Sequence, residues 1–166
     1  MLLLLNIDEF KGDYVCLGER TVNNVIQDSE FCRVSYSSHA HSINGIYIYF
    51  TVDSLRTEKN FNKTRIKFGP PRNLFIRKFQ AIEELILKKI EPSSTHVKHI
   101  GHQMEQGLFK VLEYHGGNSF ALKISGAWVN KYECGLTYRF ISIDPVKTAL
   151  DLRFCSQPLI RQSRTL

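Results

Sequence analysis

The fold of this chain is decided by residues 120–141, which read FALKISGAWVNKYECGLTYRFI. Large apolar residues alternate with small or polar ones on either side of a polar stretch, and these residues are Phe120, Leu122 and Ile124, then Leu136, Tyr138 and Phe140. Alternation with a period of two is typical of half-buried β-strands. The segment Leu108–Tyr114 precedes this pair and ends at Gly116-Gly117, a turn signal, so we expect a three-stranded meander.

Upstream of the meander the sequence predicts more short strands and one helix. The clearest strand is Gly45–Val52, in which Tyr47 and Tyr49 face away from the isoleucines between them. Thr64–Phe68 has the same alternation and ends at Gly69-Pro70-Pro71, because proline donates no hydrogen bond to a ladder. Apolar residues then recur at helical spacing from Phe75 to Ile90, after a possible N-cap at Asn73 and before Pro92. Residues 53–61 look like a polar connector, and residues 93–107 fit a short helix or a long loop.

This order predicts a mainly β protein with one central helix. The five-stranded OB-like β-barrel, which contains one helix, is the natural candidate. The alternative is a two-sheet β-sandwich with a helical cap. We expect one β-rich domain over residues 1–150, with N-terminal strands in 1–60 and a strand-helix-meander core in 61–143, followed by a basic C-terminal tail at 151–166.

Length and composition indicate an ordinary globular chain. It has 166 residues, of which 43% are hydrophobic and 23% charged, close to globular averages. The longest apolar run, Leu2–Leu5, is far below the roughly 20 residues of a membrane helix, and it lacks the preceding basic residues of a secretory signal. We therefore expect a soluble intracellular protein without membrane contact. The four cysteines form no CxxC pair and are expected to be reduced thiols.

Charge is unevenly distributed along the chain. Residues 1–58 hold four basic and eight acidic side chains, whereas residues 59–166 hold eighteen basic and eight acidic ones. The stretch 59–78 contains seven basic residues and no acidic one. A cation-rich segment of this kind favours a polyanionic partner, because neutralised phosphates release condensed counterions. A solvated basic surface is the simpler alternative.

Motifs of common enzymes are missing from the sequence. It contains no GxxxxGK[ST], GxGxxG, GxSxG or HExxH pattern. We therefore expect a protein that is not an enzyme, with no catalytic residues and no cofactor. His96, His99 and His102 recur at every third position and would suit zinc on a helix, but no cysteine or carboxylate lies beside them at ligand spacing. No metal site is predicted, and exposed histidines are the preferred interpretation.

Basic and aromatic residues form a better constellation. Proteins that bind single strands stack bases on aromatic rings and hold phosphates with lysine and arginine. For each ring taken singly, a place in the core is the more common role. The candidate nucleic-acid-binding residues are Tyr47, Tyr49, Lys63, Arg65, Lys67, Arg72, Lys123, Trp128, Tyr138 and Arg139.

The segment Lys123–Trp128, KISGAW, followed by Gly135–Phe140, GLTYRF, resembles single-stranded DNA-binding proteins of large DNA viruses and related mobile elements. The resemblance extends over residues 61–143 and includes Thr64–Phe68 and the helix that follows. It implies an OB-like core and a recognisable hairpin that contains Lys123, Trp128, Tyr138 and Arg139. Many replicative single-strand binders end in an acidic tail, whereas this chain ends in basic residues.

The sequence therefore predicts a protein that binds single-stranded nucleic acid, DNA or possibly RNA, in replication or recombination of a virus or mobile element. The host nucleus or a viral replication compartment is the expected location. The alternative is a non-enzymatic structural or adaptor β-barrel protein that forms homo-oligomers. A metal-dependent nuclease that uses the histidines is the weakest interpretation.

Overall fold

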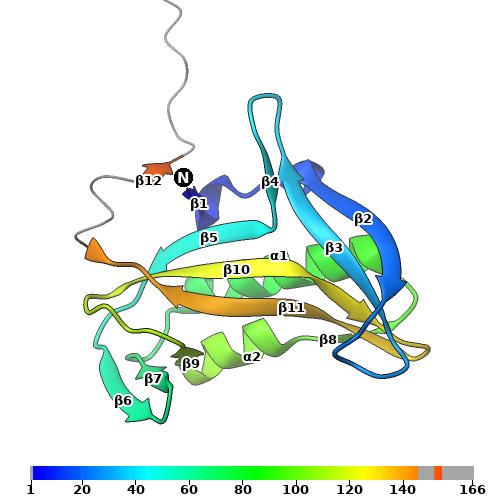
Figure 1. Cartoon of the computed structure of the whole chain (residues 1–166). Helices are drawn as coiled ribbons and strands as arrows, with labels where there is room; N and C mark the ends of the chain where they lie inside the picture. Colours follow the sequence, from blue (N-terminus) through cyan, green and yellow to red (C-terminus); the bar gives the residue numbers. More distant parts are fainter. Residues whose placement is uncertain (1, 146–151, 155–166) are drawn as a thin grey trace, which may run out of the picture.

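The computed structural model describes residues 2–145 and 152–154, and within them it contains one large mixed β-sheet with two α-helices on one side (Figure 1). The main path of the sheet runs β12-β1-β5-β10-β11-β9-β7-β6. The strands are β1 (Leu2–Asn6), β2 (Val15–Val22), β3 (Glu30–Ser37), β4 (Ser42–Asn44), β5 (Ile46–Thr51), β6 (Arg56–Asn60), β7 (Lys63–Lys67), β8 (Thr95–Val97), β9 (Leu108–Val111), β10 (Ser119–Val129), β11 (Glu133–Ser142) and β12 (Leu152–Phe154). The helices are α1 (Asn73–Ile90) and α2 (His99–Gln106), and Ile7–Glu9 and Gly12–Tyr14 form short 3-10 turns.

The long antiparallel pair β10–β11 forms the centre of the sheet. The predicted alternation is confirmed, because Phe120, Leu122 and Ile124 are fully buried while Thr137 and Arg139 of the partner strand are exposed. Buried aromatic and aliphatic side chains of these strands pack against α1 on the inner face of the sheet. There the ring of Phe140 stacks on the ring of Phe109 from β9, with their centroids 4.5 Å apart. The main hydrophobic core therefore lies between the sheet and the helices. A second small cluster of Leu4, Ala121 and Ile143 is also buried, and Tyr47 and Tyr49 pack against it.

Strand β10 changes its partner halfway along. Its first half pairs with β5, and its second half pairs with β3. The register against β11 shifts between Ile124 and Gly126, which marks a β-bulge that bends the strand. A side chain at Gly126 would place its Cβ only 2.3 Å from the Cys32 carbonyl oxygen, so the close approach of β3 requires glycine here.

Helix α1 covers the inner face of the sheet with its apolar side, as the spacing predicted. Phe79, Ile86 and Leu87 are almost fully buried. The helix begins at Asn73 itself, and the N-cap position is occupied by Arg72, which makes no side-chain cap hydrogen bond. It ends at Ile90, before Pro92, as expected.

Three features differ from the sequence-based expectations. The residues between 93 and 107 form β8 and a second helix, α2, so the expectation of a single helix was wrong. The expected connector 53–61 contains strand β6, which lies at the sheet edge with every residue exposed. The main path has free ends at β12 and β6, so the sheet is open over the described part of the chain. The coarse prediction of a mainly β protein is confirmed.

Three of the four cysteines lie in the described part of the chain. Cys16, Cys32 and Cys134 are free thiols, and burial raises the pKa of Cys32 and Cys134. Cys155 and nearly all of the predicted basic tail lie outside the described residues.

Neither helix in the described ranges has the length and apolar character needed to cross a bilayer.

Candidate nucleic-acid interface

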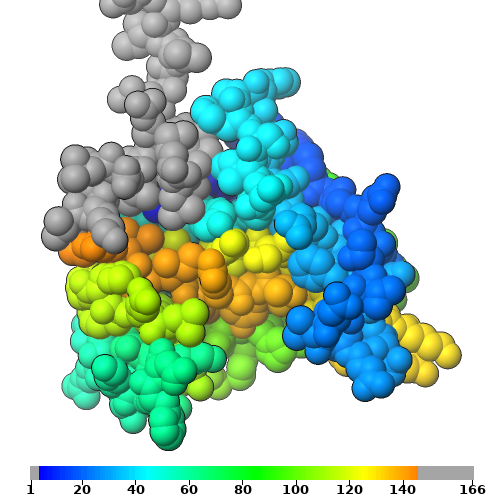
Figure 2. All heavy atoms as spheres, viewed as in Figure 1, coloured from blue at the N-terminus to red at the C-terminus, as the bar shows by residue number. Residues whose placement is uncertain are grey.

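The face of the sheet that points away from α1 carries most of the predicted binding residues. Strand pairing sets the face, because side chains alternate along each strand and directly paired residues share a side. Tyr47 pairs with Lys123, and Lys123 pairs with Arg139 on its other side. In Figure 2, which views this outer face, β10 and β11 lie in the middle, between the β2–β4 region and the segments around the β6–β7 hairpin.

Four cations from four strands lie in one line across this outer face. Phe140 of β11 pairs with Val111 of β9, so the preceding residues, Arg139 and Lys110, lie level with each other on the opposite face. Lys110 in turn pairs with Arg65 of β7. We call Lys123, Arg139, Lys110 and Arg65 the cationic row. Neighbouring strands are about 4.8 Å apart, so the row is about 14 Å long.

Acidic side chains neutralise little of the positive charge of the cationic row. Within the described part of the chain, Lys123, Arg139 and Lys110 belong to no recorded ion pair. Arg65 Nη1 lies 3.6 Å from Glu58 Oε2 at the far end of the row. Lys123 Nζ lies 5.2 Å from the centre of the Tyr47 ring at the other end. Three of the four positive charges are therefore available to an anionic ligand.

Two large rings lie over glycines on the same outer face. Trp128 pairs with Gly135, where an added Cβ would lie 2.7 Å from Trp128 Cζ2. Phe31 pairs with Trp128 on the other side, and its ring lies 2.6 Å from the position of a Cβ on Gly126. Both rings are half-buried. The glycines leave room for the rings to lie across the sheet, on the same face as the cationic row and four residues along β11 from Arg139.

Other predicted residues lie beside the row or away from it. Lys63 and Lys67 are on the outer side of β7, next to Arg65. Tyr49 is half-buried, and its hydroxyl oxygen lies 3.1 Å from Ser119 Oγ. Tyr49 has at least one other interaction besides this hydrogen bond. Arg72 lines a separate pocket of about 430 Å³ beside the Gly69–Pro71 loop.

Tyr138 faces the opposite side of the sheet from Arg139. Its ring contacts Phe140 in the core, and its hydroxyl donates a hydrogen bond of 2.6 Å to Gln103 Oε1 of α2. Burial, together with the negative charge of Glu83, raises the pKa of Tyr138 to about 12. Tyr138 is therefore not brought together with the other candidates.

Sequence reasoning missed Lys110, Arg33 and Phe31. Arg33 and Phe31 alternate with buried Cys32 and Val34, so the period of two placed both on one face. This period of two is the sequence signal that points to Phe31 and Arg33. Lys110 joins the row through strand pairs that are distant in sequence, and no local pattern reveals such a register.

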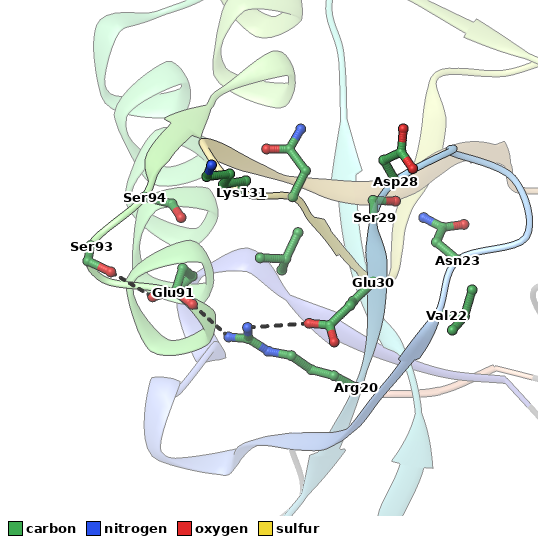
Figure 3. Close-up of a pocket in the computed structure, with 12 residues that line it drawn as sticks. Arg20, Val22, Asn23, Asp28, Ser29, Glu30, Glu91, Ser93, Ser94 and Lys131 are labelled. Carbon is green, nitrogen blue, oxygen red and sulfur yellow. Dashed lines mark hydrogen bonds and ion pairs between the residues drawn. The ribbon is translucent and has the colours of Figure 1, made fainter.

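A polar pocket of about 560 Å³ lies where α1 ends against β2, β3 and the β10–β11 turn (Figure 3). Figure 3 shows Arg20 reaching towards both Glu30 and Glu91. Arg20 donates to the Ile90 carbonyl at 2.8 Å and to Glu91 Oε2 at 2.9 Å. The hydrogen bond to Glu91 raises the pKa of Arg20, and the same bond lowers the pKa of Glu91. Arg20, Glu30 and Glu91 are paired with one another, so they fix the end of α1 to β2, and Lys131 is the remaining cation among the described lining residues.

The histidines do not form a metal site in the described residues. His96 is in β8, and its Nε2 lies 2.8 Å from the Glu91 carbonyl oxygen. His99 and His102 are in α2, where the His102 ring contacts the Gln106 side chain. No group of three histidine, cysteine or carboxylate side chains in residues 2–145 and 152–154 has the geometry to hold a metal ion.

Comparisons with protein-family models, curated proteins and solved structures found no match to this chain.

Proposed function

We propose that this chain is a non-enzymatic protein that binds single-stranded nucleic acid, with DNA as the expected ligand, across the outer face of its sheet. The cationic row carries the proposal. Four cations from four strands lie in line, and three of them have no recorded ionic partner in the described structure. A line of unneutralised cations favours a linear polyanion over a small acidic ligand.

The rings favour an unpaired strand. Tyr47, Trp128 and Phe31 are half-buried on the face that carries the row. Bases stack on such rings only when their own faces are free, which excludes most bases in a duplex. In this arrangement the row holds phosphates, and the rings add affinity that tolerates any sequence.

The first test reverses two charges in the middle of the row. Lys123→Glu with Arg139→Glu removes two charge-assisted phosphate contacts, each worth about 1.5–3 kcal/mol. We expect affinity for a fluorescent single-stranded oligonucleotide to fall about a hundredfold or more. The control is Arg77→Glu with Lys88→Glu, the same change of charge on exposed positions of α1, on the other side of the sheet. Lys88 pairs with Glu84 at 2.8 Å, so the melting temperature of this variant is measured beside its affinity.

The two double variants separate a local site from net charge. Equal losses in both would mean that total charge alone attracts the oligonucleotide. Affinity like that of the unmodified protein in the Lys123/Arg139 variant would reject the outer face as the binding surface. Light scattering with and without oligonucleotide tests the rival function, because a structural homo-oligomer would assemble regardless of DNA.

The proposal includes the biological role implied by the resemblance: replication or recombination of a virus or mobile element, in the nucleus or a replication compartment. It also includes the OB-like relationship. The bend of β10 between β5 and β3, and a long helix against the inner face, support that relationship. The parallel pairs of β11 with β8 and β9 depart from a simple five-stranded Greek-key barrel.

A further inference from the structure

The tip of the β6–β7 hairpin carries an aromatic residue that folding does not explain. Asn60 pairs with Lys63, so Phe61 and Asn62 form a two-residue turn. The Phe61 side chain is 92% exposed, and its φ is 53°, in the left-handed region that favours glycine. Phe61 therefore strains the backbone and buries almost no apolar area in return. Strain of this kind is often kept for a function.

A pocket of about 370 Å³ lies between this tip and the end of the cationic row. Its lining comprises Asn60, Phe61, Asn62, Lys63, Arg65 and Lys110. Two of these residues belong to the row, and the two asparagines supply amide donors and acceptors. The volume is within the usual range for small-ligand sites, about 300–1,000 Å³. Cations, amides and one exposed ring are the groups that recognise a nucleotide.

The anion beside this pocket is weakly held. Glu58 approaches Arg65 Nη1 at 3.6 Å, and its side chain is 60% exposed. A surface pair of this length contributes little, so a phosphate can displace the carboxylate. Arg65 Nε is also buried without a hydrogen-bond acceptor among the described atoms. A phosphate would therefore be held by the terminal guanidinium nitrogens of Arg65, because Nε is enclosed by protein atoms.

We propose that this pocket binds one unpaired nucleotide at the end of the strand's path, with its base stacked on Phe61 and its phosphate held by Arg65, Lys110 and Lys63. This inference rests on the proposed function, because the cationic row leads the strand into the pocket. It assigns the β6–β7 hairpin a specific role, as the element that captures a base.

The first test replaces the strained ring with Phe61→Gly. Glycine adopts a positive φ without strain, so we expect the melting temperature to stay the same or rise. Affinity for a labelled oligothymidylate of about 20 nucleotides, longer than the ~4–16 nucleotides that one small domain covers, should fall about tenfold. Phe61→Tyr retains a ring and should bind like the unmodified protein. Unchanged affinity in Phe61→Gly would overturn the proposal.

The second test removes the competing carboxylate. Glu58→Gln should strengthen oligonucleotide binding several-fold, because Arg65 is then free for phosphate. Glu19→Gln is the matched control, since Glu19 is an exposed residue of β2 away from the pocket. An equal gain in both variants would reflect net charge alone and would count against a phosphate site at Arg65.

A third measurement separates failure of this site from failure of the proposed function. Phe61→Trp in a Trp128→Phe background places the chain's single tryptophan at the tip. Base stacking should quench the fluorescence of this tryptophan as the oligonucleotide saturates the protein. Anisotropy of the label on the oligonucleotide measures that saturation independently. Binding by anisotropy without quenching would overturn only the nucleotide pocket. The absence of any anisotropy change in the unmodified protein would overturn the proposed function as well.

Discussion

Tyr138 and Arg139 are adjacent in sequence and lie on opposite sides of the sheet. Tyr138 donates its hydroxyl hydrogen to Gln103 of α2, whereas Arg139 is exposed in the cationic row. A shared hairpin therefore does not imply a shared surface. The pair provides a test that distinguishes the two faces residue by residue.

Tyr138→Phe should weaken the fold and leave binding intact. It removes one part-buried hydrogen bond, which is worth about 1 kcal/mol, so urea unfolding should show a loss of that size. Oligonucleotide affinity should be unchanged, because the ring is on the inner face. A variant with lost affinity and full stability would instead place Tyr138 in contact with the ligand.

The phenol of Tyr138 also predicts a dependence on alkaline pH. Its pKa is about 12 in the folded protein, raised from 10.0. The folded state therefore holds this proton more tightly than the unfolded state, and its stabilising contribution is lost as pH rises from about 10 towards 12. Tyrosinate absorption should show a late-titrating component that is lost in Tyr138→Phe. A spectrum unchanged by that substitution would contradict the burial of this hydroxyl.

Alternation correctly assigned residues to faces wherever apolar and polar positions differed clearly. In the Gly45–Val52 segment, Ile46, Ile48 and Phe50 are buried as predicted. The same pattern in residues 136–141 already separated Tyr138 from Arg139, although both were chosen for one site. The outer position of Phe31 was equally visible. At this scale the period of two is sufficient to assign each residue to its face of the sheet.

The two helices are joined by a buried carboxylate. Glu83 of α1 is 1% exposed, and its two oxygens accept hydrogen bonds from the Ile100 and Gly101 amides at 3.0 and 2.8 Å. These amides belong to the first turn of α2, where backbone N–H groups have no partner within the helix. Glu83 therefore fixes the start of α2 against α1. Burial raises the pKa of Glu83, although the two amides oppose that change.

Glu83→Gln tests this joint. The amide oxygen replaces only one of two acceptors, so we expect a loss of about 1–3 kcal/mol in unfolding free energy. The pKa of Glu83 is raised in the folded state, so the folded protein holds the extra proton above pH 4.5, the ordinary glutamate value. The stability advantage of the unmodified protein over the variant should therefore shrink as pH rises through this window. A difference that grows with pH would show that the amides, not burial, dominate.

Strand β6, which the sequence did not predict, and helix α2, which it left open as a short helix or a loop, share a physical cause. Strand β6 is an edge strand with all five residues exposed, so no apolar alternation marks it. Helix α2 has eight residues and obtains its N-terminal acceptor from Glu83, sixteen positions before its first residue. By contrast, α1 has a continuous apolar side and was predicted almost to its ends. Elements held by tertiary contacts leave a weak local signal.

At the scale of the whole molecule, binding depends on strands that are far apart in sequence. The cationic row combines residues of β10, β11, β9 and β7, and two of its three strand contacts join segments that are not neighbours along the chain. Charge counts predicted a basic half of the chain. Only the register of the folded sheet selects which of those cations lie in line.

The number of cations in line sets the salt dependence. For single strands, log K falls against log salt with a slope of about −0.7 per neutralised phosphate, so four contacts predict a slope of about −3. Titrations at several salt concentrations measure it. The Lys123/Arg139 double variant should have a slope about half as steep. An unmodified protein whose affinity is independent of salt would not be binding through this row.

The row runs across the strands, not along one of them. Each step from one cation to the next is therefore a step between hydrogen-bonded strands, which the backbone fixes at about 4.8 Å. The backbone therefore fixes where each side chain begins, whereas the flexible lysine and arginine stems let each charge move to meet a phosphate. Such a row can follow strands of differing local geometry, so it suits a ligand of any sequence.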